Sequence, residues 1–419
     1  MNEAPARFAD GQPGKAHGMD QQLAALVELL DGMHLAPPER LPAVAAAAGR
    51  ALDADVIVYL VDYQQHILCP LSGPGVPERE QLDVDTTLAG WAFRLVETLP
   101  SQAGGSHRLW VPLLDGVERL GVIEVVLHER AGRAAIDLRD PEVLRLCRWL
   151  SSMIGHLITV TGRYGDVLEN VRLRRRRTPA AELLAGVMPP LTAGIDSFML
   201  AGIVEPCYEV GGDAFDYALA EDTASLAIFD AVGHTLSSGL IASAAVGAYR
   251  STRRGRDSLH EQATAIDRVI AESFRSGSFA TGVLVELDLT NGRLQYVNAG
   301  HPPPHVLRGG KVVKPLTGGR RLPFGLGGAE LTVGEESLQP DDWLVLHTDG
   351  ITEALDHNGE VFGQARLFDF LQREAAAQYP PPETVRRLVK AVMSHQRDVL
   401  QDDATLLLAR WGSPGLLTP

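Results

Sequence analysis

Four short apolar segments in the C-terminal half of the chain meet aspartate at one end. The aspartates at these positions are Asp213 and Asp216 after a glycine pair, Asp230, Asp349, and the adjacent Asp402 and Asp403. A lone aspartate at the end of a strand often caps a turn or a helix. Four such positions, several of them beside glycine, instead favour a fold that collects carboxylates where its strands end.

Collected carboxylates need cations, because like charges repel one another. Mg²⁺ and Mn²⁺ are hard cations that bind oxygen ligands and fill their remaining positions with water. The composition agrees with such a site, since 53 Asp and Glu outnumber 38 Lys and Arg and give a formal net charge of -15. A nucleic-acid-binding protein normally needs a basic face. We therefore predict a divalent-metal protein that does not bind nucleic acid.

Short apolar strands alternate with long helical stretches in the same half of the chain. Strands are predicted over 198–203, 225–229, 282–287, 294–297, 343–347 and 404–409, and helices over 238–253 and 259–274. Runs of this length and apolar content are typical of strands buried in a core. The pattern indicates an α+β domain, rich in antiparallel strands and built in layers.

The N-terminal half has the pattern of a smaller mixed α/β domain. Helices are predicted over 21–30, in the Ala-rich stretch to Leu52 and over 86–97, and strands over 56–61, 67–71, 109–114 and 121–127. The last two strands flank a turn at Asp115 and Gly116. This order, with the hairpin VPLLDGVERLGVIEVVL, resembles a GAF domain. The resemblance implies small-ligand sensing or dimerisation, and no residue selects a ligand.

Apolar residues spaced alternately three and four apart run from Val143 to Val171. This spacing is typical of a coiled-coil seam, and it predicts a helical linker that joins two copies of the chain into a homodimer. The alternative is one helix packed on its own GAF-like sheet. Three glycines, Gly155, Gly162 and Gly165, each weaken the helix by roughly 1 kcal/mol relative to alanine.

A basic run, Arg172–Arg177, follows the seam and precedes Pro179, which marks a domain boundary. Such a run is usually a solvated helix face. A hinge and a docking patch for an acidic partner are the other interpretations. The predicted divisions are a disordered tail over 1–20, the GAF-like domain over 21–137, the helical linker over 138–179 and the C-terminal domain over 180–412.

The three cysteines are scattered at Cys69, Cys147 and Cys207, so a zinc ribbon, a thioredoxin motif and a disulfide scaffold are all unsupported. Sparse cysteines suit a reducing compartment. No apolar run approaches the ~18 residues of a membrane span, and the N-terminus lacks the apolar core of a signal peptide. We therefore predict a cytoplasmic protein that does not enter a membrane.

Six sequence motifs occur in the order found in one family. They are PCYEVGGDAFDYAL, LAIFDAVGH, FATGVLVELDLTNGRLQYVNAGHPPPHVL, PFGL, LVLHTDGITEALDHNGEVFG and DDATLLLAR. Between about Ala180 and Trp411 the chain resembles the SpoIIE/RsbU class of PPM metal-dependent serine/threonine phosphatases. The resemblance implies an αββα sandwich that holds two Mn²⁺ or Mg²⁺ ions. It also implies hydrolysis of phosphoserine or phosphothreonine, typically on a STAS-fold antagonist of an anti-sigma factor.

The resemblance also implies roles for individual residues. Asp230 matches the carboxylate that bridges the metals, Ala231 the residue that offers its carbonyl, Asp349 and Asp402 terminal ligands, and Asp213 a ligand that binds directly or through water. Asp230 and Asp349 would serve catalysis through a metal-activated water. Asp216 is expected to lie outside the ligand set. His234, Asn298 and His301 are expected to shape loops.

Two positions depart from the family pattern, because Ala214 stands where an aromatic residue is common and Thr235 where a second glycine is common. Thr235 would strain its turn if its φ were positive. No motif for a side-chain nucleophile is present. A water molecule activated by metal is therefore the expected nucleophile. The alternatives are a catalytically weak signalling scaffold and a small-molecule phosphohydrolase.

Overall fold

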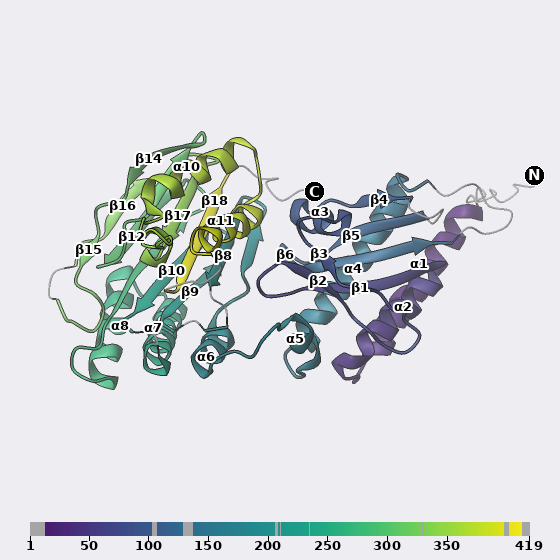
Figure 1. Cartoon of the computed structure of the whole chain (residues 1–419), viewed down its shortest axis with the longest axis horizontal. Helices are drawn as coiled ribbons and strands as arrows, with labels where there is room; N and C mark the ends of the chain where they lie inside the picture. The colour runs from purple at the N-terminus through teal and green to yellow at the C-terminus, as the bar shows by residue number, and fades with distance from the viewer. Residues whose placement is uncertain are drawn as a thin grey trace, which may run out of the picture. The chain divides into compact units, whose positions relative to one another are not determined.

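The computed structural model describes residues 13–102, 107–128, 137–205, 208–209, 211–233, 235–328, 331–397 and 402–412. The chain divides into two compact units, Met1–Arg174 and Arg175–Pro419 (Figure 1). Each unit combines helices with antiparallel sheet, so the predicted α+β class is confirmed.

One six-stranded sheet forms the centre of the N-terminal unit, in the order β3-β2-β1-β6-β5-β4. Its strands are β1 (Ala54–Val61), β2 (Ile67–Pro70), β3 (Leu82–Asp83), β4 (Leu99–Ser101), β5 (His107–Asp115) and β6 (Glu118–Leu127). All described pairs in this sheet are antiparallel. The predicted hairpin is β5–β6, and Gly116 at its turn has a φ of 59° that few other residues adopt readily.

Helices cover both faces of this sheet. The helices are α1 (Pro13–Met33), α2 (Leu41–Ala51), α3 (Leu88–Leu95), α4 (Pro141–Thr161) and α5 (Val167–Arg172). Because side chains alternate along a strand, β1 sends Val56 and Val58 into a core with α1, α2 and α4. Ile57 and Tyr59 pack in a second core, which α3 completes.

The helix α1 begins at Pro13, inside the stretch 1–20 that was predicted to be disordered. Ala25 and Leu29 anchor it in the core. A helix that has been nucleated gains one hydrogen bond for each residue added, which accounts for its extension toward the N-terminus. Residues 1–12 lie outside the described part of the chain.

The structure differs from the coiled-coil prediction for the linker. One helix, α4, ends at Thr161, and the next, α5, begins only at Val167, so no single helix runs through the seam. The most buried face of α4 carries Leu150, Ile154 and Ile158, which pack in the core of the N-terminal unit. The alternative arrangement, a helix packed on its own sheet, is therefore the one observed.

Gly155 shows why α4 lies so close to the sheet. A Cβ at this position would lie 2.0 Å from the carbonyl oxygen of Leu114 in β5. Glycine weakens the helix, but it permits an approach that no larger residue allows. The apolar spacing and Gly155 therefore both favour the packing of α4 against its own sheet.

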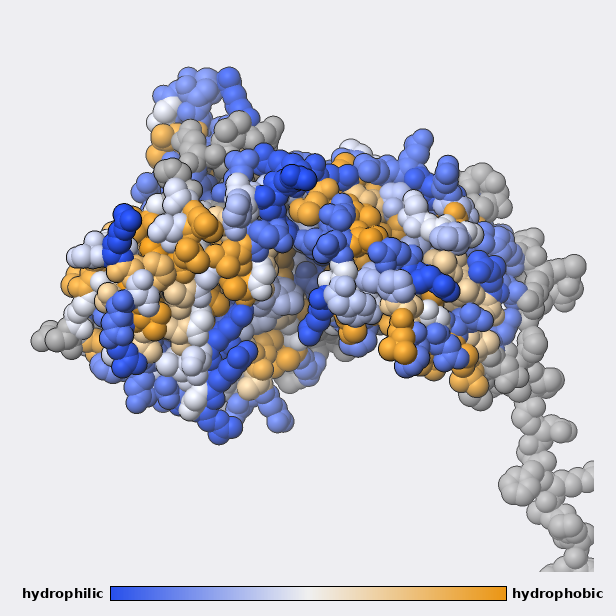
Figure 2. Space-filling model, turned by 90° about the horizontal axis from the view of Figure 1, so that it is seen from below, coloured by the Kyte–Doolittle hydropathy of each residue, from blue (hydrophilic) through white to orange (hydrophobic). Residues whose placement is uncertain are grey.

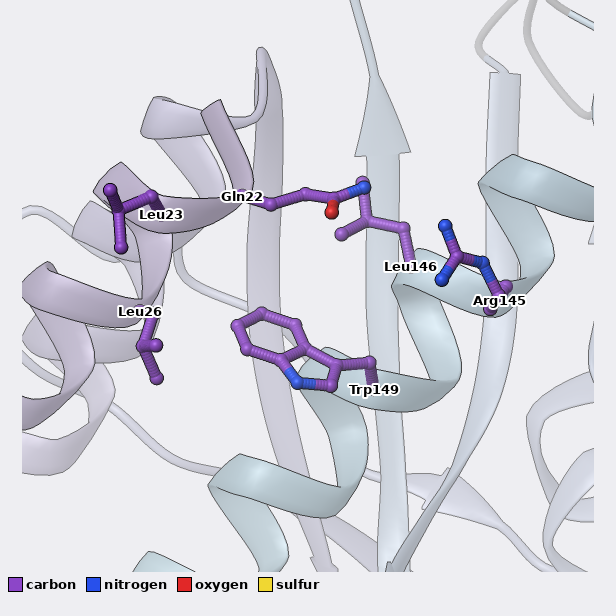
Figure 3. Close-up of a pocket in the computed structure, with 6 residues that line it drawn as sticks. All are labelled: Gln22, Leu23, Leu26, Arg145, Leu146 and Trp149. Carbon is purple, nitrogen blue, oxygen red and sulfur yellow. The ribbon is translucent and has the colours of Figure 1, made fainter. Parts of the chain in front are cut away.

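Part of the apolar seam remains at the surface. Leu146 and Trp149 of α4, together with Leu23 and Leu26 of α1, line a cavity of about 360 Å³ whose rim also carries polar side chains (Figure 3). Val160 is 44% exposed. Exposed apolar side chains also occur in the C-terminal unit, and Figure 2 shows apolar areas interspersed with polar ones over both units.

Two six-stranded sheets form the C-terminal unit. The first has the order β15-β12-β11-β10-β9 with β16 beside β12, and the second the order β14-β13-β17-β18-β8-β7. The strands are β7 (Thr192–Ile195), β8 (Phe198–Glu205), β9 (Asp213–Leu219), β10 (Thr223–Ala231), β11 (Ala280–Asp288), β12 (Arg293–Ala299), β13 (His305–Arg308), β14 (Lys311–Pro315), β15 (Arg320–Arg321), β16 (Gly334–Ser337), β17 (Trp343–His347) and β18 (Ala404–Trp411).

Helices lie outside the two sheets in an αββα arrangement. They are α6 (Pro179–Val187), α7 (Leu236–Gly255), α8 (Leu259–Ser273), α9 (Asp349–Thr352), α10 (Gly363–Ala376) and α11 (Pro381–His395). The first sheet contacts α7 and α8, whereas the second contacts α9 and α11. Along β18, Leu407 faces the core shared with the first sheet, and Leu406 and Leu408 face the helices on the other side.

The basic run is divided between the two units. Arg172 donates a hydrogen bond to the carbonyl oxygen of Val61 and stacks on Tyr63 in the N-terminal unit. Arg175 pairs with Glu209 at 2.9 Å in the C-terminal unit. These side chains contact their own units, which does not favour the interpretation of the run as a freely solvated helix face.

Candidate metal centre

The first two predicted ligands are neighbours across a β-ladder. Asp213 is the first residue of β9, and it lies directly opposite Asp230 near the end of β10. The close approach depends on Gly212, since a Cβ there would lie 2.3 Å from the carbonyl oxygen of Ala231. The glycine pair therefore allows the strand carrying Asp213 to begin beside Asp230 and the predicted carbonyl ligand.

Hydrogen bonds connect Asp213 to the second sheet. Its Oδ2 accepts the hydroxyls of Thr348, at 2.8 Å, and Thr405, at 2.6 Å. The two threonines are themselves linked, because the backbone N–H of Thr405 donates to Oγ1 of Thr348 at 2.9 Å. Asp213 is only 2% exposed. The buried carboxylate therefore ties the start of β9 to the residue after β17 and to the start of β18.

Asp349 and Asp402 come from the second sheet. Asp349 follows β17 as the first residue of α9, and Asp402 precedes β18. A Cβ on Gly350 would lie 1.9 Å from the carbonyl oxygen of Asp403, so glycine is required for these two turns to pack together. The TDG and DDAT motifs thus meet at the same end of the sandwich.

Among the described residues, the charged groups that shift the pKa of Asp230 are carboxylates and include no arginine or lysine. Burial, followed by the nearby carboxylates of Asp349, Asp402 and Asp403, raises the pKa of Asp230 to about 7. Burial is likewise the main reason that the pKa of Asp213 lies well above its usual range, and the Asp230 and Asp403 carboxylates add to the effect. Every charged group that shifts the pKa of Asp230 is another carboxylate.

This donor set fits hard divalent cations, which bind carboxylate and carbonyl oxygens and would balance the repulsion. Within the described residues, no three histidine, cysteine, aspartate or glutamate side chains are already gathered closely enough to hold an ion. The structure brings Asp213 and Asp230 side by side and places Asp349 and Asp402 within electrostatic reach of Asp230. The roles of these residues as ligands remain a prediction.

Asp216 does not join this group. The glycine turn ends at Gly212, and Asp213 and Asp216 both belong to β9, three positions apart. Side chains alternate along a strand, so the two carboxylates point to opposite faces. Asp216 instead pairs with Arg250, at 2.6 Å, and Arg253, at 3.3 Å, on α7. Asp216 therefore belongs to a buried ion-pair cluster with a structural role.

The loop residues have the structural roles predicted for them where they are described. Asn298 closes a turn, because its side chain donates to the carbonyl oxygen of His301 at 3.0 Å and accepts the His301 N–H at 2.9 Å. Thr235 has a φ of −123° and forms a capping box at the start of α7, so no strain arises there. Ala214 is fully buried in β9. His234 lies outside the described residues.

Sequence reasoning assigns no individual role to three residues that support the site, namely Thr348, Asp403 and Thr405. The oxygen Oδ2 of Asp403 accepts the backbone N–H groups of Gly211 and Gly212, both at 2.8 Å. The available signal was a threonine within two positions of an aspartate in both TDG and DDAT. It could have indicated hydroxyl donors for a carboxylate.

Among the described helices, none is long and apolar enough to cross a membrane.

Comparison with known proteins identifies the C-terminal region. The family model described as Stage II sporulation protein E (SpoIIE) matches residues 220–412. The phosphoserine phosphatase RsbP of Bacillus subtilis is 24% identical over 208 residues, which cover 48% of this chain and 49% of RsbP. Protein IcfG of Synechocystis is 27% identical over 142 residues, which cover 34% of this chain and 22% of IcfG.

A solved structure of the RsbU and RsbW domains of Rv1364c from Mycobacterium tuberculosis is also similar, with 26% identity and a TM-score of 0.46. The match covers 55% of this chain and 63% of that one. The chain spans less than half the length of the curated relatives described above. The family match and the order of the acidic motifs identify residues 220–412 as a SpoIIE-family phosphatase domain of the PPM class.

Proposed function

We propose that the C-terminal unit hydrolyses phosphoserine or phosphothreonine on a signalling protein, with two Mn²⁺ or Mg²⁺ ions as cofactors. The observation that carries this proposal is the group of carboxylates around Asp230, whose charged neighbours are all acidic. Such a group is stable in its ionised form only with a cation. The similarity to a phosphoserine phosphatase supports the choice of reaction.

Asp230 would hold both ions, and Ala231 would offer its backbone carbonyl. Asp349 and Asp402 would be terminal ligands, and Asp213 would bind directly or through water. When bound, the ions would acidify a water molecule and neutralise charge that develops on the phosphoryl group. Asp213, fixed by Thr348 and Thr405, keeps its carboxylate in place as the charge at the site changes.

The proposed substrate is a phosphorylated STAS-type antagonist of an anti-sigma factor. The resemblance to the SpoIIE/RsbU class implies this kind of partner, and the similarity to a phosphoserine phosphatase agrees with a phosphorylated substrate. The GAF-like N-terminal unit would regulate the activity. The remaining apolar surface of α4 and α1 supports a homodimer through the linker region, because it includes the exposed Val160 and the cavity beside Trp149.

The deciding experiment measures phosphate release by the full chain from three substrates. These are a phosphorylated STAS protein, p-nitrophenyl phosphate and a panel of nucleotides. We expect Mn²⁺- or Mg²⁺-dependent release that is fastest from the protein and abolished by EDTA. Faster release from nucleotides would support a small-molecule phosphohydrolase, and no release from any substrate would support a scaffold.

A further inference from the structure

Asp403 contacts the segments that carry three of the four predicted carboxylate ligands. Its Oδ2 accepts the N–H groups of Gly211 and Gly212 at 2.8 Å and of Asp213 at 3.3 Å. Its own N–H donates to Oδ1 of Asp402 at 2.9 Å. Its carbonyl oxygen accepts the hydroxyl of Thr348, the residue before Asp349, at 3.4 Å.

The contact with the glycine turn crosses a long stretch of sequence, because Asp403 and Asp213 are 190 positions apart. Three consecutive N–H groups that point to one oxygen form a concave site for an anion. Here the anion is a carboxylate from the same chain. This turn is therefore occupied internally, and it is not the place where a substrate phosphate would bind.

We propose that Asp403 is a positioning residue that holds the Gly211–Asp213 turn and thereby sets Asp213 beside Asp230 for the metals. The inference rests on the proposed function, and it adds to that function a residue that is not itself a ligand. A charged acceptor suits this role better than a neutral one, because hydrogen bonds to a carboxylate are stronger. Through its own backbone N–H and carbonyl groups, Asp403 also holds Asp402 and the turn before Asp349 in place relative to Asp213.

The test compares Asp403→Ala and Asp403→Asn in the full chain, with Asp369→Asn on the exposed side of α10 as the matched control. Mn²⁺ affinity is measured by calorimetry, and activity on p-nitrophenyl phosphate is measured as a function of Mn²⁺ concentration. Removing a residue that orients ligands typically lowers metal affinity about 10- to 100-fold. We expect that loss for Asp403→Ala, a smaller one for Asp403→Asn, and none for the control.

Two further measurements separate positioning from ligation and from simple unfolding. Excess Mn²⁺ should restore most of kcat in Asp403→Ala, whereas Asp230→Asn should stay inactive. Amide hydrogen exchange should quicken over residues 211–213 in both Asp403 variants. If Asp403→Ala does not fold, the Asp403→Asn variant decides by the same readouts.

Unchanged Mn²⁺ affinity together with unchanged exchange would overturn the proposal. A loss that excess Mn²⁺ cannot restore in a folded variant would also overturn it, since Asp403 would then be a ligand. If the wild-type chain binds no Mn²⁺ and releases no phosphate, the proposed function fails. Hydrogen exchange over 211–213 would in that case still show whether Asp403 holds the turn.

Discussion

A buried carboxylate of the N-terminal unit and a half-buried one of the C-terminal unit have opposite electrostatic surroundings. In the N-terminal unit, Glu124 on β6 is fully buried, and it pairs with Arg79 at 2.8 Å and Arg108 at 2.9 Å. In the C-terminal unit, Asp230 has only carboxylates as charged neighbours that shift its pKa. For the buried acid Glu124, the chain supplies two arginines. Within the described part of the chain, no arginine contributes to the pKa shift of Asp230, which is the arrangement expected of a site completed by metal ions.

Asp216 makes the same distinction within one strand. It lies three positions from Asp213 on β9 and pairs with two arginines of α7. Asp213 instead receives two threonine hydroxyls. The nature of the partner separates a structural carboxylate from a candidate ligand more clearly than position in a motif does.

The largest expected effect is the loss of activity in Asp230→Asn. Removing a residue that is predicted to bind both ions should lower activity by more than the roughly 10- to 100-fold loss that follows removal of a residue supporting a metal ligand. Asp216→Asn should leave more activity, since Asp216 contacts arginines and no predicted ligand. Phosphate release and Mn²⁺ binding measure both variants. Equal losses would remove the distinction between the two carboxylates.

The next effect concerns the arginines around Glu124. Replacing Arg79 and Arg108 together by Met leaves a buried carboxylate without its partners. Breaking a buried ion pair in this way costs about 3–5 kcal/mol of unfolding free energy, and the partial exposure of both arginines lowers that figure. Hydrogen exchange in β5 and β6 of the full chain measures the loss. Adding Glu124→Leu should recover part of the stability, and no recovery would argue against an uncompensated charge.

A smaller effect is the response of the metal-free protein to pH. The pKa of Asp230 rises from 3.8 to about 7 on folding, so the folded chain binds this proton more tightly than the unfolded chain. This contribution to stability is complete below about pH 4 and is lost as the pH rises through 7. The slope from this group cannot exceed about 1.4 kcal/mol per pH unit. Denaturation in EDTA between pH 4 and 7 checks it.

Two comparisons accompany that measurement. Asp230→Asn should flatten the pH dependence, and Mn²⁺ should stabilise the protein most at the higher pH, where the carboxylates are ionised. A profile that is already flat in the wild-type chain in EDTA would show that the acidic end does not carry the proposed excess of charge.

The smallest effect on folding is expected at the surface of α4. Leu146→Glu with Val160→Glu alters half-buried or exposed positions, and surface changes usually stay within about 0.5 kcal/mol. If the homodimer forms through this face, light scattering should show monomers while the catalytic unit stays folded. A variant that remains dimeric would place the interface elsewhere. Leu150 is unsuitable for this test, because it lies in the core.

The core strands and the acidic turns could be predicted because their signals are local. Apolar β-branched runs such as 56–61 are buried on both faces of the sheet. Asp349 followed by glycine marks a turn. The strand β9 was missed because the letters GGDAFD suggest a turn. Only pairing with β10 shows that Asp213 begins a strand.

The packing of α4 could not be settled from spacing. The helix carries apolar residues on two adjacent faces, the predicted seam with Leu146 and Met153 and the buried face with Ile154 and Ile158. The apolar residues of either face recur with the period of an α-helix. The choice depends on the approach of Gly155 to β5, a contact between distant segments. The contacts of Asp403 with the glycine turn could not be predicted for the same reason, since these partners lie far away in sequence.

The hydrogen bond between Thr405 and Asp213 has a consequence for the order of synthesis. The two residues are 192 positions apart, so this hydrogen bond cannot form until nearly all of the domain has left the ribosome. The first strand to carry a predicted ligand must wait for the last strand before its carboxylate gains both hydroxyl donors. A nascent chain therefore holds an incomplete site until β18 has left the ribosome. The proposed hydrolysis would therefore begin only after the sandwich is complete.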